Sequence, residues 1–185
     1  MTSVPGYDYH GIYEGEVVLN IDPDQRGRVL VQVTDVAGME PVFWAEASSP
    51  VAGSGMGFYA VPAIGTTVWI TFVGGDPSRA VWLGNPHETS ADLPSDVITN
   101  TNPLTPPVML YTQEGHNVAL IDGLQLDGGP GGIFLRHAFG HSIEITETHI
   151  KLSFGLPGGV QSTIQLDATG VSINGTALTV SNLGV

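Results

Sequence analysis

The strongest constraint on the fold comes from residues 109–185, where short segments alternate between apolar and polar side chains. Successive side chains of a β-strand point to opposite faces of its sheet. Each segment therefore has one apolar face and one face of Ser, Thr, Glu, Gln, Asn or His. The apolar positions that carry this alternation are Ile143, Ile145, Ile150, Leu152, Ile164, Leu166, Val171, Ile173, Leu178 and Val180.

This one-sided pattern is an energetic problem for a single chain, because no helix or second long segment is available to cover the apolar faces. Apolar burial contributes roughly 25 cal/mol per Å² and is the main term that opposes chain entropy. Identical copies around an axis solve the problem, since each copy supplies strands to a shared core. We therefore predict an oligomer whose core is lined by the ten residues named above. The pattern does not give the number of copies.

A repeated phrase supports a stacked architecture in the same region. Residues 115–120 (GHNVAL) return as residues 140–145 (GHSIEI), and residues 162–167 (STIQLD) are a looser third copy. Repeats on this scale are typical of elongated folds in which each unit packs against its neighbours. In an oligomer, His116 and His141 of this phrase are candidates for an axial metal site. The competing interpretation is that these turn histidines bond only to backbone and water.

The first half of the chain predicts a second all-β unit. Strands are expected at residues 12–20, 28–36, 42–48, 66–73 and 79–83, with turn signals between them. Five short strands in this span suit a small closed barrel, which leaves no exposed sheet edge. We expect an N-terminal extension at 1–10, the barrel at 11–85, a Pro-rich linker at 86–108 and an elongated β-rich unit at 109–185.

Composition excludes several classes of function. The chain has 185 residues, 18 acidic and five basic side chains, a net charge of −13 and no cysteine. Five scattered cations cannot form the basic surface that nucleic acid or anionic lipid requires. The absence of cysteine removes disulfides, zinc-thiolate sites and thiol nucleophiles. Neither a signal peptide nor an apolar run long enough to span a bilayer is expected.

The short motifs that could indicate a metal, nucleotide or catalytic site do not fit the patterns of those sites. Residues 22–27 (DPDQRG) resemble the start of a calcium loop, but Val33 stands where the bidentate glutamate belongs, so a β-turn is predicted. Residues 53–57 (GSGMG) fit neither a dinucleotide loop nor a hydrolase elbow, and a flexible loop is predicted there. The aromatic residues of the first half are assigned to core or interface packing. We predict no catalytic residue, no cofactor and no enzymatic activity.

Residues 11–85 resemble the oligonucleotide/oligosaccharide-binding-fold (OB-fold) domain of phage baseplate central-spike proteins and of VgrG-type spikes in type VI secretion. The phrases that carry the resemblance are residues 13–15 (YEG), 22–29 (DPDQRGRV), 43–45 (FWA), 62–65 (PAIG), 68–70 (VWI), 74–77 (GGDP) and 81–84 (VWLG). The second half is similar to the triple-stranded β-helix of these spikes through residues 114–116 (EGH), 140–144 (GHSIE) and 164–171 (IQLDATGV).

The resemblance implies an intertwined homotrimer in a virion tail baseplate or a related contractile injection particle. Its barrel would attach to a separate tail hub protein, and its β-helix would pierce the target envelope, in transient mechanical contact with the membrane, when the sheath contracts. A small tip protein at the C-terminal end is a further possible partner. The family implies synthesis in the host cytoplasm without a signal peptide. The lysozyme domain and the His-x-His apex of some relatives have no counterpart in this sequence.

Two alternatives remain open at this level. One is a trimeric β-helical hydrolase that acts on polysaccharide through Glu and Asp residues on the outer face of the needle. The other is an OB-fold barrel that binds nucleic acid, which the composition disfavours.

Overall fold

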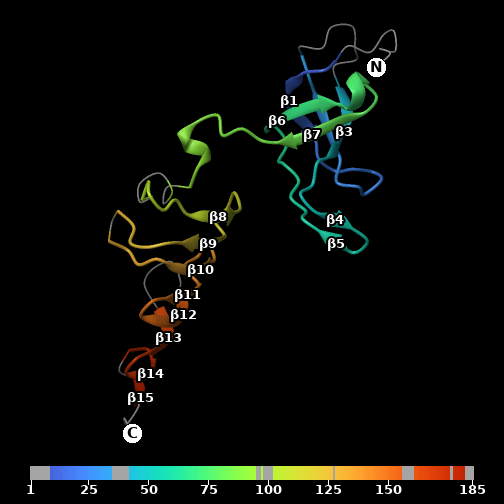
Figure 1. Ribbon diagram of the computed structural model, residues 1–185. Helices are drawn as coiled ribbons and strands as arrows, with labels where there is room; N and C mark the ends of the chain where they lie inside the picture. The colour runs from blue at the N-terminus through green and yellow to red at the C-terminus, as the bar shows by residue number, and fades with distance from the viewer. Residues whose placement is uncertain are drawn as a thin grey trace. The chain divides into compact units, whose positions relative to one another are not determined.

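A computed structural model describes residues 9–34, 42–94, 97, 102–126, 128–155, 161–175 and 177–181. The chain divides into two compact units, Met1–Glu88 and Thr89–Val185, which are described separately. Strands dominate both units (Figure 1), and the predicted all-β class is confirmed. Where the structure describes the chain, no helix is long and apolar enough to cross a membrane.

The N-terminal unit is a closed barrel of five strands. The strands are β1 (Ile12–Leu19), β2 (Val29–Gln32), β3 (Val42–Ala47), β6 (Thr67–Phe72) and β7 (Ala80–Gly84). They follow the order β1-β2-β3-β7-β6, and β6 pairs with β1 to close the barrel. Only the β3–β7 pair is parallel among these contacts. The predicted barrel is therefore confirmed, with strand ends that differ from the expected ones by a few residues; residues 35 and 36 of the second expected strand lie outside the described residues.

Alternation along the strands fills the barrel interior. Val29, Val31 and Val33 occupy every second position and are buried, while Gln32 between them is exposed. Gly15 of β1 is also buried, and a Cβ at this position would lie 3.0 Å from a methyl of Val33 and 3.1 Å from Ile70. The core is packed so closely here that only glycine fits without movement of its neighbours.

The glycine-rich excursion between β3 and β6 differs from the prediction. Instead of a loop without regular structure, it contains a two-stranded hairpin of β4 (Ala52–Gly53) and β5 (Met56–Gly57). Gly55 takes a φ of +71° at the tip, a conformation that costs glycine little and so closes the tight turn. The sequence analysis did not predict this hairpin, because it read the glycines as turn residues without the short strand pairs that they flank; the flexibility of the segment stays a prediction.

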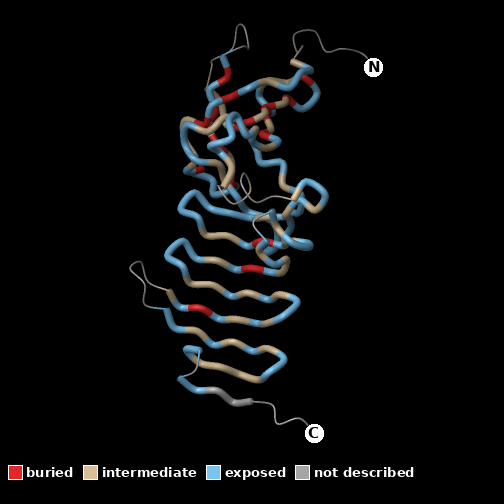
Figure 2. The backbone as a smooth tube through the Cα atoms, turned by 90° about the vertical axis from the view of Figure 1, so that its left-hand side faces the viewer, coloured by how far each residue is buried: buried red, intermediate tan, exposed pale blue. Residues whose placement is uncertain are grey.

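The C-terminal unit is one antiparallel sheet of eight strands. The strands are β8 (Val108–Tyr111), β9 (Asn117–Ile121), β10 (Gly132–Arg136), β11 (Ser142–Thr146), β12 (His149–Gly155), β13 (Gln161–Asp167), β14 (Gly170–Ile173) and β15 (Leu178–Ser181). Each strand pairs with its neighbours in sequence, so the sheet is a simple meander. Figure 2 shows it as a ladder of stacked rungs.

The repeated phrase corresponds to one turn used twice. Gly115 donates to the carbonyl of Thr112 and has a φ of +93°, while Gly140 donates to the carbonyl of His137 and has a φ of +89°. In each hairpin the histidine after the glycine closes the turn through its carbonyl. The 25-residue offset is therefore the length of chain that runs from one β-hairpin to the second one along the meander.

Candidate functional site

The most prominent feature of the C-terminal unit is an apolar face that the chain itself leaves uncovered. Strand register aligns its apolar positions into two rows, each with one residue from every strand. The first row is Val108, Leu120, Ile133, Ile145, Ile150, Leu166, Val171 and Val180. The second row is Leu110, Val118, Leu135, Ile143, Leu152, Ile164, Ile173 and Leu178.

Thirteen of the fifteen row residues whose burial the structure describes are exposed in the single chain, and Leu178, for example, keeps 55% of its surface in solvent. Phe154 of β12 extends the same face and is 54% exposed. Figure 2 shows the contrast with the N-terminal unit, where the buried segments gather. An uncovered apolar surface of this extent is typical of an interface and is rare on a monomeric protein.

All ten residues that the alternation singled out lie in the two rows. The other six, Val108, Leu110, Val118, Leu120, Ile133 and Leu135, were missed by the sequence analysis. Their strands carry apolar residues on the opposite face as well, namely Met109, Ala119 and Phe134, which hides the period of two. A search that tolerated one apolar residue on the polar face would have found them.

The opposite face of the sheet is mostly polar and is held together by local contacts. Glu144 and Lys151 are cross-strand partners, and the guanidinium of Arg136 lies 4.2 Å from the ring centroid of Phe134. The Asp167 carboxylate accepts hydrogen bonds from the hydroxyl of Thr169 and from the side-chain amide of Gln165. These bonds, that of Thr169 most strongly, lower the pKa of Asp167 to about 2. On this face Ala119, Phe134 and Ser153 are buried and most of the polar side chains are half-buried, so the single chain covers this face more than the apolar one.

His116 and His141, the candidates for an axial metal, lie in the β8–β9 and β10–β11 turns, at the ends of these strands. Each uses Nδ1 to accept a backbone N–H, from Ala138 and Gly155 respectively, at 3.2 Å. With Nδ1 engaged in this way, the ring proton of the neutral form resides on Nε2. Within the described ranges, no group of three or more His, Asp or Glu side chains is arranged to hold a metal ion.

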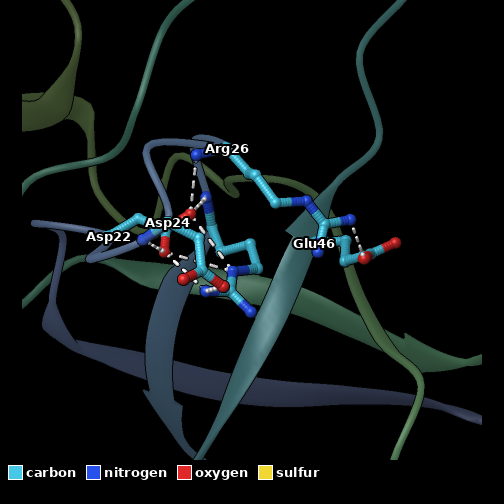
Figure 3. Close-up of polar contacts among 5 residues, drawn as sticks. Asp22, Asp24, Arg26 and Glu46 are labelled. Carbon is cyan, nitrogen blue, oxygen red and sulfur yellow. Dashed lines mark hydrogen bonds and ion pairs between the residues drawn. The ribbon is translucent and has the colours of Figure 1, made fainter.

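The loop that resembles a calcium site is held by an internal carboxylate clamp (Figure 3). The Asp22 carboxylate accepts backbone N–H groups of Asp24, Arg26 and Arg28, and Arg28 also donates to it from Nη2 at 2.7 Å. The Arg28 side chain, together with the backbone donors, holds the pKa of the buried Asp22 well below its usual range. The carboxylate thus organises the turn between β1 and β2.

The barrel carries a second surface feature beside the β4–β5 hairpin. A groove of about 630 Å³ runs between this hairpin and the end of β7, and exposed Met56, Phe58, Tyr59 and Leu83 lie in its lining. Trp82 also lines it but is buried, as is Phe72 in the core. The predicted use of aromatic residues for packing therefore holds for Trp82 and Phe72, whereas Phe58 and Tyr59 remain open to solvent.

The chain thus combines a small closed barrel with a sheet whose apolar face is uncovered in the single chain. Each of the two parts matches a known family. Residues 13–87 match the type VI secretion system/phage-baseplate injector OB domain, and residues 107–179 match the phage baseplate V C-terminal trimerisation domain. The chain belongs to the spike proteins of phage baseplates and type VI secretion systems. No curated protein matches it.

These two families are structural domains, and the order of the two matches along the chain is that of the predicted spike. The trimerisation family supports a homotrimer, which supplies the copy number that the alternation alone did not give.

Proposed function

We propose that three copies of this chain bury the two apolar rows against one another and form the central spike of a contractile injection machine. The observation that carries the proposal is the exposure of thirteen row residues in the single chain. The ten residues predicted from the alternation, from Ile143 to Val180, are then the larger part of the trimer core.

The free energy gained by burying these apolar residues is large enough to drive assembly of the trimer. The exposed row residues keep about half of their surface in solvent, for example 46% at Ile164 and 50% at Leu152. Complete burial of such a side chain contributes about 1.5–3 kcal/mol, so half of it contributes about 1 kcal/mol. Thirteen residues then give each chain on the order of 10 kcal/mol of apolar burial that only its partners can provide.

Within the spike, we assign residues 11–85 to attachment to a separate tail hub protein, residues 86–108 to the linker and residues 109–185 to the needle. The exposed apolar groove beside the β4–β5 hairpin supports a protein contact on the barrel. Among the strands that the structure describes, β15 pairs only with β14, and this open side supports a small tip protein at the C-terminal end. The needle pierces the target envelope when the sheath contracts, and its work is mechanical and not enzymatic.

The acidic character of the chain is consistent with this role. At a net charge of −13 per chain, the trimer is repelled by anionic phospholipid and does not adhere to the membrane that it crosses. In this proposal the protein resides in the tail baseplate of a virion or in a related injection particle.

The proposal is tested first by the mass of the particle. Size-exclusion chromatography with light scattering is expected to give three times the mass of one chain, without dissociation on dilution to nanomolar concentration. A folded monomer would contradict the proposed trimer. Incubation with peptidoglycan or capsular polysaccharide is expected to release no sugar, and turnover would favour the hydrolase alternative instead.

A further inference from the structure

The apolar face of the C-terminal sheet continues beyond its two rows at one edge, where the β8–β9 and β10–β11 turns and the end of β12 lie. Here His116, His137 and His141 form a histidine column, with successive ring centroids 4.3 Å and 5.1 Å apart. The ring of Phe154 stacks on His141 at 4.5 Å, and that of exposed Phe139 lies 5.3 Å from His137. We call these five residues the aromatic edge.

Strand register explains why the aromatic edge continues the apolar face. Side chains two positions apart on a strand share a face of the sheet. His141 precedes Ile143 by two positions, and Phe154 follows Leu152 by two positions. Ile143 and Leu152 are cross-strand partners in the second apolar row. The aromatic edge is therefore a third row on the same face, continuous with the surface that the proposed trimer buries.

The opposite edge of the sheet is apolar at the same level. Successive turns of the ladder alternate between its two sides (Figure 2), so the β9–β10, β11–β12 and β13–β14 turns share this edge. The β9–β10 turn exposes Leu124 and Leu126, each with 66% of its surface in solvent. The other two turns are short and carry residues 147–148 (ET) and 168–169 (AT). Among the described residues of this edge, leucine therefore occurs only in the β9–β10 turn.

The backbone of the β9–β10 turn holds the two leucines in place. The carbonyl of Gln125 accepts the N–H of Gly128 at 3.0 Å, and the N–H of Gln125 donates to the carbonyl of Gly129 at 2.9 Å. Gln125 itself is half-buried, while the leucines on either side of it are exposed. The turn is thus closed by its own hydrogen bonds and still presents two large apolar side chains to solvent.

We propose that the aromatic edge of one copy packs against Leu124 and Leu126 of the next copy, which forms a seam on each side of the needle. A cyclic three-fold interface is heterologous, so each copy presents one surface and meets a different one on its neighbour. Rotation about an axis along the stacked strands leaves every residue at its own height. The two surfaces match in height, since β9 and β10 lie between β8 and β11 in the sheet. This inference rests on the proposed trimer.

Because the chain has no cysteine, a pair of introduced cysteines tests the seam directly. We would treat the full-length double variant Leu126→Cys, Phe139→Cys with the short cross-linker bismaleimidoethane. Within one chain, the two positions lie beyond opposite ends of β10, whose five residues span about 16 Å, so the reagent joins them only between copies. A covalent species of three chains is expected on a denaturing gel. Each single-cysteine variant has one thiol per chain and can give at most a pair.

The matched control combines Phe139→Cys with Ala168→Cys. Ala168 is exposed and lies at the same edge as Leu126, but in the β13–β14 turn further along the sheet. This variant is expected to give no three-chain species. If light scattering shows the Leu126→Cys, Phe139→Cys variant to be a trimer and no three-chain species forms, the seam is refuted and the trimer stands. A monomeric wild type would refute both.

A second variant decides the matter if the double-cysteine protein does not assemble. Leu126→Asp is expected to unfold at least about tenfold faster than the wild type in guanidinium chloride, since the loss of one buried leucine side chain corresponds to about one power of ten. Ala168→Asp, at the same edge outside the seam, is expected to unfold at the wild-type rate. Equal rates for the two aspartate variants would show that Leu126 stays in solvent and would overturn the proposal.

Discussion

Replacement of Ile164 by aspartate tests the assignment of the apolar face most directly. Ile164 lies in the second apolar row on β13 and is 46% exposed in the single chain, so an aspartate there costs an isolated chain little. In the proposed trimer, three carboxylates would meet in one water-free core. The penalty for burying an unpaired ion is several kcal/mol even after relaxation. Three such groups therefore oppose assembly by on the order of 10 kcal/mol per trimer, or roughly seven powers of ten in the assembly constant.

The matched control is Gln161→Asp, which introduces the same side chain on the same strand but on the opposite, polar face, at an exposed position. Light scattering at micromolar concentration is expected to show trimers for the wild type and Gln161→Asp, and monomers or aggregates for Ile164→Asp. Ile143→Asp, in the same row on β11, is expected to behave like Ile164→Asp. A stable, soluble Ile164→Asp trimer would show that this row faces outward and would refute the assignment.

The remaining predictions concern the barrel. Asp22→Asn is expected to lower the melting temperature at pH 7 because it breaks the ion pair with Arg28, whereas the exposed Asp24→Asn is expected to change it less. Since the pKa of Asp22 is lowered on folding, its contribution is present above the ordinary aspartate value and is lost as the pH falls below about 4. The difference in melting temperature should therefore begin to shrink below about pH 4 and keep shrinking as the pH falls further, and a difference that stays constant between pH 7 and pH 3 would contradict the ion-pair explanation. Gly15→Ala is expected to cost about 1–3 kcal/mol in urea denaturation because its Cβ meets core side chains, whereas the exposed Glu14→Ala on the same strand should be nearly neutral. An unchanged stability for Gly15→Ala would show that the core can move to admit a methyl group.

Strand positions and faces were predictable wherever one residue in two was apolar and the others were polar. This condition holds from Ile143 onward, and there every residue assigned to the apolar face lies in the two rows. It fails in β9 and β10, because Ala119 and Phe134 are apolar on the other face. Both are buried by neighbours on that face, at 0% and 4% exposure, which no pattern within one strand can indicate.

Contacts between side chains of different segments could not be predicted from the sequence. The sequence located His116 and His141 in equivalent turns, but not the column that they form with His137, because that requires the register between hairpins. Likewise, the turn after β1 was predicted, but the clamp between Asp22 and Arg28 was not. Such contacts depend on where side chains of different segments meet, and spacing along the chain does not specify it.

The amino-acid sequence by itself determined that this chain has a one-sided apolar half and must associate with other copies to cover it. That conclusion follows from a local property, since the period of two assigns each side chain to a face without knowledge of its neighbours. Only the tertiary structure decided that the strands form a meander in sequence order, that their apolar side chains align into two continuous rows, and that a histidine column joins the turns at one edge. Register and edge contacts are set by hydrogen bonds and packing between segments, which become fixed only when the whole sheet forms.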